Sequence, residues 1–536
     1  MGGYLWNRKA TRRTWRACRQ PYSFYHDFIA RYWAGGPSEA SAAPVHRLCT
    51  LARKMGAASL LVEDGLDRPD VQEEIAHLEQ LAETEGAVSA ATITFFSRPK
   101  RRDRDLARVP TDAVIGQMCI ISFPGCHGPK SYVYEALFRL PGKGQEKAPL
   151  LNNHIPIAGE LAVVAGGHEH RFRGSYFCQQ NGISSICAHS AVRTLVRTLK
   201  GVHIATCELN SFWQYNPDTR PISTRKVEDA LRKYGFRPVV YDLRASAQTV
   251  SDYPPDNIWG LLTLLADSGS PSLLTLSEGE PADHVVPILG HTFNSDEWHP
   301  LGTILHKGGE ETTASSHLWI DHLVLHDDML GPYYCLSRAG LISGQNKKQL
   351  TPQLVIAMLP DEVEVSPAQA EDFARQVIGR VLKMLARSGL GEGRWWDYLL
   401  KLDERRVFRT TLINRDDYLA GLGYHADPAH CTLPAGRRPM VERMAAALPE
   451  RMWMCEVSLP NLLLANRAKL GELLIDAKEF PEEQDKLLQC LKGFRLPSLL
   501  GWSERPAGGP VQLFGGRWET NGHSPIHTPH QHGNWW

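Results

Sequence analysis

The sequence predicts an α+β protein built from several units, and three observations lead to this prediction. The chain has 536 residues, which is too long for one ordinary domain. Its apolar content of 43% and charged content of 22% are typical of globular proteins. Segments with apolar residues at helical spacing alternate with short strand-like runs, and Pro-rich or Gly-rich stretches separate them. We therefore expect about three folded units.

Residues 1–108 are expected to form an N-terminal arm and a small α/β region. A helix-like stretch at 71–83 is followed by a strand-like run at 87–96, and residues 98–108 form a charged hinge. Residues 109–175 contain short alternating runs separated by turn signals, near 118–123, 132–140, 160–165 and 170–174. This pattern predicts a small antiparallel β unit.

Residues 176–358 are predicted to form the core that carries the chemistry. Apolar residues recur at helical spacing from 188 to 199, so one face of this helix is expected to be buried. Helices near 223–234 and 256–267 are each followed by a strand, at 237–243 and 272–276. Two further apolar runs follow, one beginning at His284 and one ending at Asp327.

The last part of the chain is predicted to be a separate accessory unit and a tail. Residues 359–504 begin at a proline-marked boundary and contain a helix at 368–387, then strand-like runs at 406–413, 451–459 and 470–475. This pattern predicts an α+β accessory domain. Residues 505–536 are rich in Pro, Gly and His and are expected to be a flexible tail.

Composition argues against several classes of function. The formal net charge is zero, so we expect no nucleic-acid partner. No apolar run reaches the 18 or so residues that span a bilayer, so no membrane association is expected. Eleven scattered cysteines and no signal-peptide pattern favour free thiols in the cytoplasm. No phosphate-binding glycine motif or close Cys-x-x-Cys pair is present, so no cofactor and no metal are expected.

Cys187 is the candidate nucleophile. It lies at the predicted start of the amphipathic helix, where the positive end of the helix dipole favours a thiolate. Gln180 lies seven residues upstream and Gln179 eight, and Gly182 between them and Cys187 would let the loop fold back. The side-chain amide of either glutamine is a candidate donor to an oxyanion, with Gln180 preferred.

His284 is the preferred base and His291 the alternate. Seven residues separate them, so in a regular strand they face opposite sides and at most one faces Cys187. His189 follows Cys187 by two positions on the same helix and therefore points away from it. Asp327, which comes directly before a turn, is the preferred carboxylate to orient the imidazole. Asp328 and Asp321 are the alternates.

These residues resemble the papain-like cysteine peptidase superfamily, and most closely its bacterial branch of double-glycine leader peptidases. In that branch a glutamine precedes a cysteine at a helix start, a histidine leads a later strand, and an aspartate ends the next one. Gln180, Cys187, His284 and Asp327 follow this order within residues 176–340. The chain departs from the pattern in having Ala188 where glycine is usual.

Further departures are a histidine at 291 where tyrosine is common and a glutamine-to-cysteine gap one residue longer than usual. A long insertion at 292–317 is expected to form a lid or a substrate-reading loop.

The resemblance implies a bacterial-type cysteine peptidase or amidohydrolase with a papain-like core. Cys187, His284, Asp327 and Gln180 would act as nucleophile, base, orienting residue and oxyanion donor. The implied substrate is a protein or peptide cleaved at a peptide, isopeptide or related amide, and the accessory units offer surfaces for a protein partner. Two alternatives stay open: a non-catalytic papain-like scaffold, and an acyl or amine transferase of transglutaminase type.

Overall fold

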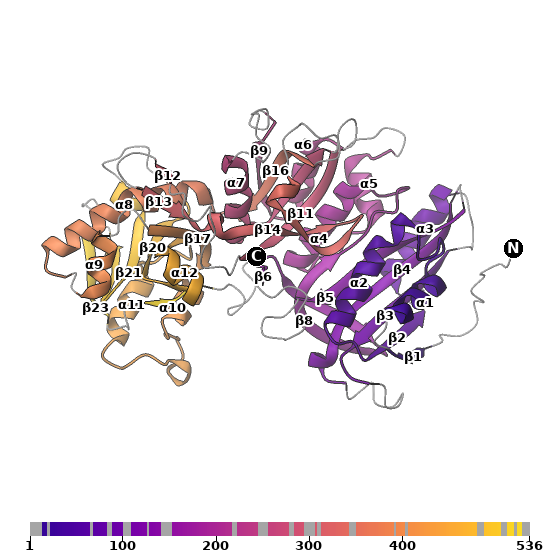
Figure 1. The fold of residues 1–536 in the computed structure, drawn as a ribbon, viewed down its shortest axis with the longest axis horizontal. Helices are drawn as coiled ribbons and strands as arrows, with labels where there is room; N and C mark the ends of the chain where they lie inside the picture. The colour runs from indigo at the N-terminus through magenta and orange to yellow at the C-terminus, as the bar shows by residue number, and fades with distance from the viewer. Residues whose placement is uncertain are drawn as a thin grey trace.

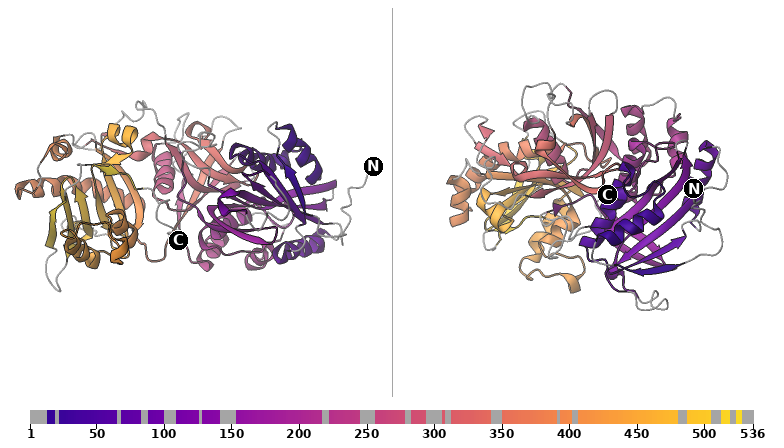
Figure 2. Two further views of the ribbon diagram at one scale, coloured as in Figure 1. Left: turned by 90° about the horizontal axis from the view of Figure 1, so that it is seen from below. Right: turned by 45° about the vertical axis from the view of Figure 1, so that its right-hand side comes forward.

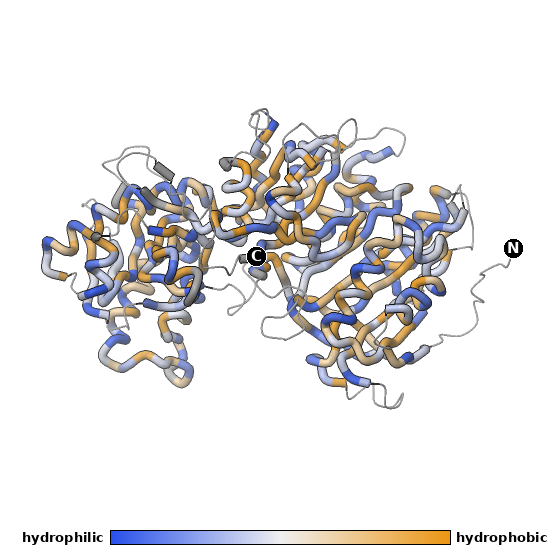
Figure 3. The backbone as a smooth tube through the Cα atoms, viewed as in Figure 1, coloured by the Kyte–Doolittle hydropathy of each residue, from blue (hydrophilic) through white to orange (hydrophobic). Residues whose placement is uncertain are grey.

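The computed structural model has three main antiparallel or mixed sheets in a row, each covered by helices, and the α+β class is confirmed (Figures 1 and 2). The structure describes residues 13–18, 22–64, 68–82, 88–99, 109–125, 128–140, 153–216, 222–244, 256–277, 283–293, 306–307, 312–341, 350–390, 393–401, 406–479, 487–504, 512–518 and 523–527. Figure 3 shows apolar segments, in orange, running through the strands and the helices packed on them. No helix among these residues is long and apolar enough to cross a membrane.

The first sheet belongs to the N-terminal part of the chain, and all of its strand pairs are antiparallel. Its strands, in spatial order, are β1 (Thr14–Ala17), β2 (Ser59–Asp64), β3 (Ser89–Phe96), β4 (Val114–Gly125), β5 (Gly128–Arg139), β8 (His168–Phe177) and β7 (Gly159–Ala165). The accompanying helices are α1 (Ser23–Tyr32), α2 (Ala43–Lys54) and α3 (Pro69–Ala82).

The second sheet is central and also antiparallel throughout. Its order is β15 (Gly331–Ser337), β14 (Ile320–Asp327), β11 (Asp283–Phe293), β10 (Ser272–Ser277), β16 (Thr351–Leu359) and β9 (Arg237–Asp242), and β6 (Asn153–His154) pairs with β11. The helices of this part are α4 (Cys187–Lys200), α5 (Thr206–Trp213), α6 (Thr224–Lys233) and α7 (Asp256–Asp267).

Both faces of the central sheet are buried, because its strands carry apolar residues at consecutive positions. On β10, Leu273 joins the core that contains α4, whereas Leu274 joins the core that contains α7. On β14, Val324 joins the core that contains α4, and Leu325 joins the core that contains α7. Since alternate residues of a strand face opposite sides, α4 and α7 cover opposite faces of the sheet. The core around α4 also includes α1, α2 and residues of the first sheet, so the two sheets share one interior.

The third sheet forms the C-terminal part. Its order is β12 (His306–Lys307), β13 (Thr312–Ser315), β17 (Arg406–Asn414), β18 (Arg451–Ser458), β20 (Gly471–Asp476), β21 (Leu491–Leu496), β22 (Leu499–Glu504) and β23 (Gln512–Arg517). Its helices are α8 (Pro367–Arg387), α9 (Arg394–Lys401), α10 (Arg415–Gly421), α11 (Arg438–Ala447), α12 (Pro460–Asn466) and α13 (Leu487–Cys490), and β19 (Ala468–Lys469) pairs with β24 (Ser524–Pro525). The long helix α8 begins with a capping box, in which Ser366 and Gln369 satisfy each other's backbone N–H groups.

Three expected boundaries differ from the observed arrangement. Strand β3 pairs with β4 across residue 108, so segments 1–108 and 109–175 contribute to a single sheet. The insertion at 292–317 supplies β12 and β13, and β13 pairs in parallel with β17 of the third sheet. In the segment 505–536, expected to be a flexible tail, β23 extends the third sheet and β24 pairs with β19. The pairings of β13 with β17 and of β19 with β24 join residues far apart in sequence, which local periodicity does not encode.

Candidate active site

The loop before α4 is shaped by Asn181. Its side-chain oxygen accepts hydrogen bonds from the backbone N–H groups of Ile183, Ser184 and Ser185, at 2.9, 2.8 and 3.1 Å. Gly182 has φ +75°, a left-handed conformation that costs glycine little. This tight turn ends at the extended residue 186 and starts α4 at Cys187, as the sequence predicted.

His189 caps the start of α4. Its Nδ1 accepts the backbone N–H of Ile186 at 3.2 Å, and its Nε2 lies 2.7 Å from the side-chain oxygen of Asn210. Burial lowers the pKa of His189 to about 3, so its ring is neutral at physiological pH. His189 therefore fixes the helix terminus that presents Cys187, in agreement with its exclusion as a base.

His284 and Asp327 lie together at the ends of neighbouring strands. The Nε2 atom of His284, on β11, is 3.2 Å from Oδ2 of Asp327, the last residue of β14. The other oxygen, Oδ1, accepts the backbone N–H groups of Met329 and Leu330 at 2.8 and 2.9 Å. These bonds hold the carboxylate in the turn with one oxygen directed at the imidazole. Although burial opposes ionisation, His284 and the turn amides lower the pKa of Asp327.

Cys187 contacts the same imidazole. Burial by itself lowers the pKa of His284, but hydrogen bonds with Asp327 and Cys187 and the charges of Asp328 and Asp327 outweigh it and raise that pKa to about 11. The ring is therefore an imidazolium at neutral pH. Cys187 is partly exposed, whereas the side chains of His284 and Asp327 are 11% and 9% exposed. The fold thus brings together a sulfur, an imidazolium and a carboxylate from three separate segments.

Asp328 is a second carboxylate at this site. Its Oδ1 lies 3.6 Å from Nε2 of His284, and its side chain is 5% exposed. Burial raises the pKa of Asp328 to about 7; the charge of His284 opposes this rise and that of Asp327 adds to it. Among the described residues neither carboxylate oxygen has a well-formed hydrogen bond, although the Gln180 backbone amide helps to stabilise the ionised form.

The two candidate glutamines have different surroundings. The side chain of Gln179 is buried: its oxygen accepts the backbone N–H of Val133 at 3.0 Å, and its nitrogen donates to the carbonyl of Ser41 at 2.9 Å. These bonds tie the loop to β5 and to the short helix before α2, so the Gln179 amide is not available to a substrate. Gln180 is partly exposed and remains the candidate oxyanion donor.

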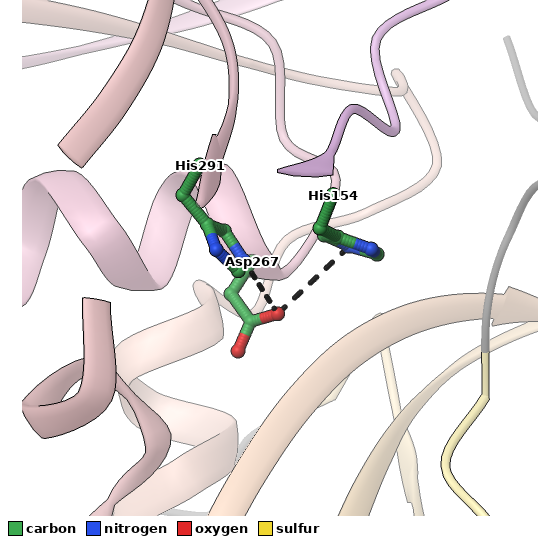
Figure 4. A group of neighbouring side chains, drawn as sticks. All are labelled: His154, Asp267 and His291. Atoms are coloured by element: carbon green, nitrogen blue, oxygen red, sulfur yellow. Dashed lines mark hydrogen bonds and ion pairs between the residues drawn. The ribbon is translucent and has the colours of Figure 1, made fainter. Parts of the chain in front are cut away.

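The remaining alternates lie elsewhere. Asp321 is near the opposite end of β14 from Asp327, and six residues of strand span about 20 Å. The Nε2 atom of His291 is 3.1 Å from Oδ1 of Asp267, at the end of α7, and its side chain is fully buried. His291 is therefore engaged in a different cluster from His284 (Figure 4).

That second cluster was not predicted from the sequence. Nε2 of His154 and Nε2 of His291 both face the same oxygen of Asp267 (Figure 4), and Arg409 from the third sheet donates from Nε to Asp267 at 2.9 Å. Arg409 also pairs with Glu456 at 2.7 Å, and Arg409, Asp267 and Glu456 are each 1% exposed. Because a guanidinium already balances the charge of Asp267 and donates toward His154 at 3.3 Å, this cluster does not suit a metal ion.

Comparison with known proteins gives no family: no protein-family model matches the chain, and no curated protein matches it significantly.

Proposed function

We propose that this protein is a papain-like cysteine hydrolase that cleaves a peptide, isopeptide or related amide. The observation that carries the proposal is the contact of Cys187, at the N-terminus of α4, with a His284 ring that Asp327 also binds. A thiol at a helix terminus beside an imidazolium is the environment that activates cysteine as a nucleophile. The packing of α4 on the antiparallel sheet whose neighbouring strands β11 and β14 carry His284 and Asp327 supports a papain-like core.

In the proposed reaction the Cys187 thiolate attacks the carbonyl carbon of the scissile amide. The side-chain amide of Gln180 donates to the oxygen on which negative charge develops. The carbon–nitrogen bond breaks as the His284 imidazolium gives its proton to the leaving amine, which leaves a thioester on Cys187. Neutral His284 then takes a proton from water, the water oxygen attacks the thioester, and breaking the carbon–sulfur bond releases a carboxylic acid.

Asp327 keeps the imidazole ring in place through both steps. Its carboxylate faces Nε2 of His284, so the opposite ring nitrogen, Nδ1, is left to exchange protons with sulfur and substrate. The raised pKa of His284 keeps the ring protonated beside the sulfur of Cys187.

The direct test is labelling by a thiol-directed electrophile such as iodoacetamide at neutral pH. We expect Cys187 to react faster than the other cysteines and Cys187→Ala to abolish this fast labelling, with a melting temperature within a few degrees of the wild type. Cys207→Ala is the matched control. Burial and Glu73 raise the pKa of the partly exposed Cys207 to about 11, so its removal should leave fast labelling unchanged. Fast labelling that survives Cys187→Ala would reject the proposal.

Two related functions use the same residues. A transferase of transglutaminase type would pass the acyl group from Cys187 to an amine instead of water, and an added primary amine would then yield a transfer product. A non-catalytic scaffold would bind a protein tail without cutting it, and Cys187 would then react no faster than an ordinary thiol. We favour the hydrolase because the imidazolium beside Cys187 serves catalysis and has no role in a passive binding cleft.

We also propose that the protein works in the cytoplasm. The ten cysteines that the structure describes are all free, as expected of a protein kept in a reducing compartment. Cell fractionation with an antibody to the chain tests this placement, and recovery from the secreted fraction would contradict it.

A further inference from the structure

The site around His284 offers three ligand atoms in the geometry of a metal centre. Nε2 of His284 lies 3.2 Å from Oδ2 of Asp327 and 3.6 Å from Oδ1 of Asp328, and the three groups are mutually within reach of one ion. Zinc binds nitrogen and oxygen at roughly 2.0–2.2 Å, which places tetrahedral ligands about 3.3–3.6 Å apart. The two separations from the His284 nitrogen are close to this range, and all three ligand atoms lie within 4.8 Å of one another.

No permanent cation pairs with the carboxyl groups of this cluster among the residues that the structure describes. Among the described residues no lysine or arginine forms an ion pair with Asp327 or Asp328, and His284 is the cationic partner of both. The cluster of His154, Asp267 and His291 has Arg409 instead. A divalent cation bound between these two buried carboxyl groups would supply the positive charge that Arg409 supplies in the other cluster, which favours its binding.

Asp328 provides an independent indication of a missing partner. It is 5% exposed, and neither of its oxygens has a hydrogen-bond partner that meets ordinary geometry among the described residues. It lines a cavity with His326, Ser190 and Thr194, and Nε2 of His326 is also without a partner there. The cavity volume of about 10 Å³ is that of one water molecule, which could complete the coordination of an ion.

We propose that His284, Asp327 and Asp328 form a binding site for a divalent cation of the zinc class, with Cys187 outside the ligand set. Binding at Nε2 leaves the proton of the ring on Nδ1, facing sulfur, so the ring can no longer exchange protons during acyl transfer. The cation is thus an inhibitor that competes with the catalytic form of the site. This regulatory consequence rests on the proposed hydrolase, whereas the binding site itself does not.

The test is a calorimetric titration of the full-length protein with zinc chloride. We expect one equivalent that binds at least about tenfold more weakly in both Asp328→Asn and Asp327→Asn, and within about threefold of wild type in Cys187→Ala. His430→Gln is the control. His430 and Asp427 form an exposed pair that could bind zinc only weakly, so removing His430 should leave the tight equivalent unchanged. Circular dichroism of each variant shows whether it has folded.

Several results would overturn the site. Absence of saturable binding would do so, and so would unchanged affinity in both carboxylate variants. Loss of the tight equivalent in Cys187→Ala together with its retention in Asp328→Asn would assign the ion to the thiol. Iodoacetamide labelling of Cys187 in zinc-free buffer tests the proposed hydrolase independently of the zinc titration. An unreactive Cys187 would reject the hydrolase and leave the zinc titration fully interpretable.

Discussion

Two buried clusters of histidine and aspartate lie on the central sheet, and the source of their positive charge distinguishes them. Asp267, between His154 and His291, is neutralised by Arg409, a permanent cation that also reaches Glu456 in the third sheet. Asp327 and Asp328 both face His284, a cation that can lose its proton. A permanent cation makes a fixed electrostatic link between units, whereas a titratable one makes a site that can move protons. The same residue types therefore form a fixed link in one place and the site of the proposed hydrolase chemistry in the other.

Arg409→Met should have the largest effect on stability. It leaves Asp267 and Glu456 buried with less compensation, and breaking a buried pair costs about 3–5 kcal/mol. Urea denaturation should show this loss, while the labelling rate of Cys187 in the native protein stays unchanged. Arg171→Met, at an exposed ion pair, should show no measurable loss. Equal midpoints for the wild type and Arg409→Met would contradict a structural role for the cluster.

Asp327→Asn should instead affect the reactivity of Cys187 more than the stability of the fold. Asparagine can still accept the turn N–H groups through its oxygen, and Asp328 remains as a partner of His284, so the urea midpoint should fall less than in Arg409→Met. The uncharged amide no longer stabilises the imidazolium, and a loss of about 10²-fold is expected in the rate of Cys187 acylation by an activated ester. A rate within twofold of the wild type would remove Asp327 from the proposed mechanism.

Asp328→Asn should change the dependence of stability on pH. The folded protein holds the Asp328 proton up to about pH 7, whereas the unfolded chain releases it near the ordinary value of 3.8. The stability contributed by this protonated carboxyl is full below about pH 4 and is lost as the pH rises to about 7. In EDTA, the melting temperature of the variant should therefore rise relative to that of the wild type as the pH increases over this range. A constant difference between the two melting temperatures would contradict the raised pKa.

Substitution of the adjacent glutamines should separate structure from chemistry on a smaller scale. Gln180→Ala should reduce the acylation rate about tenfold through loss of an oxyanion donor, with an unchanged melting temperature. Gln179→Ala removes two hydrogen bonds that tie the loop to β5 and Ser41, and should cost about 1–2 kcal/mol of stability. If Gln179→Ala slowed the reaction and Gln180→Ala only destabilised the fold, the assignment of the two residues would be reversed.

Local elements could be predicted well from the sequence because their signals are local. Helix α4 begins at Cys187, α8 spans Pro367–Arg387 against an expected 368–387, and β14 ends at Asp327. Helical periodicity and apolar runs next to turn residues determine such boundaries. The prediction that Cys187, His284 and Asp327 act together came from their order along the chain, through a family resemblance, and not from any local pattern.

What the sequence did not reveal depends on distant partners. The pairing of β3 with β4 and of β13 with β17 depends on which strands meet in space. Arg409 and Asp267 look like surface residues in the sequence, since charged residues are rarely buried without partners. Their burial becomes intelligible only when the second and third sheets meet around them. The choice between Gln179 and Gln180 likewise required the positions of Val133 and Ser41.

The most direct test of the central claim is the rate of iodoacetamide labelling of Cys187 between pH 6 and pH 8, read by peptide mass spectrometry in wild type and in His284→Gln. If an imidazolium stabilises the sulfur as a thiolate, the wild-type rate should vary by less than about threefold over this range. The rate of His284→Gln should fall about tenfold for each unit by which the pH is lowered. Identical slopes in the two proteins would show that His284 does not activate Cys187, and the proposed hydrolase would have to be abandoned.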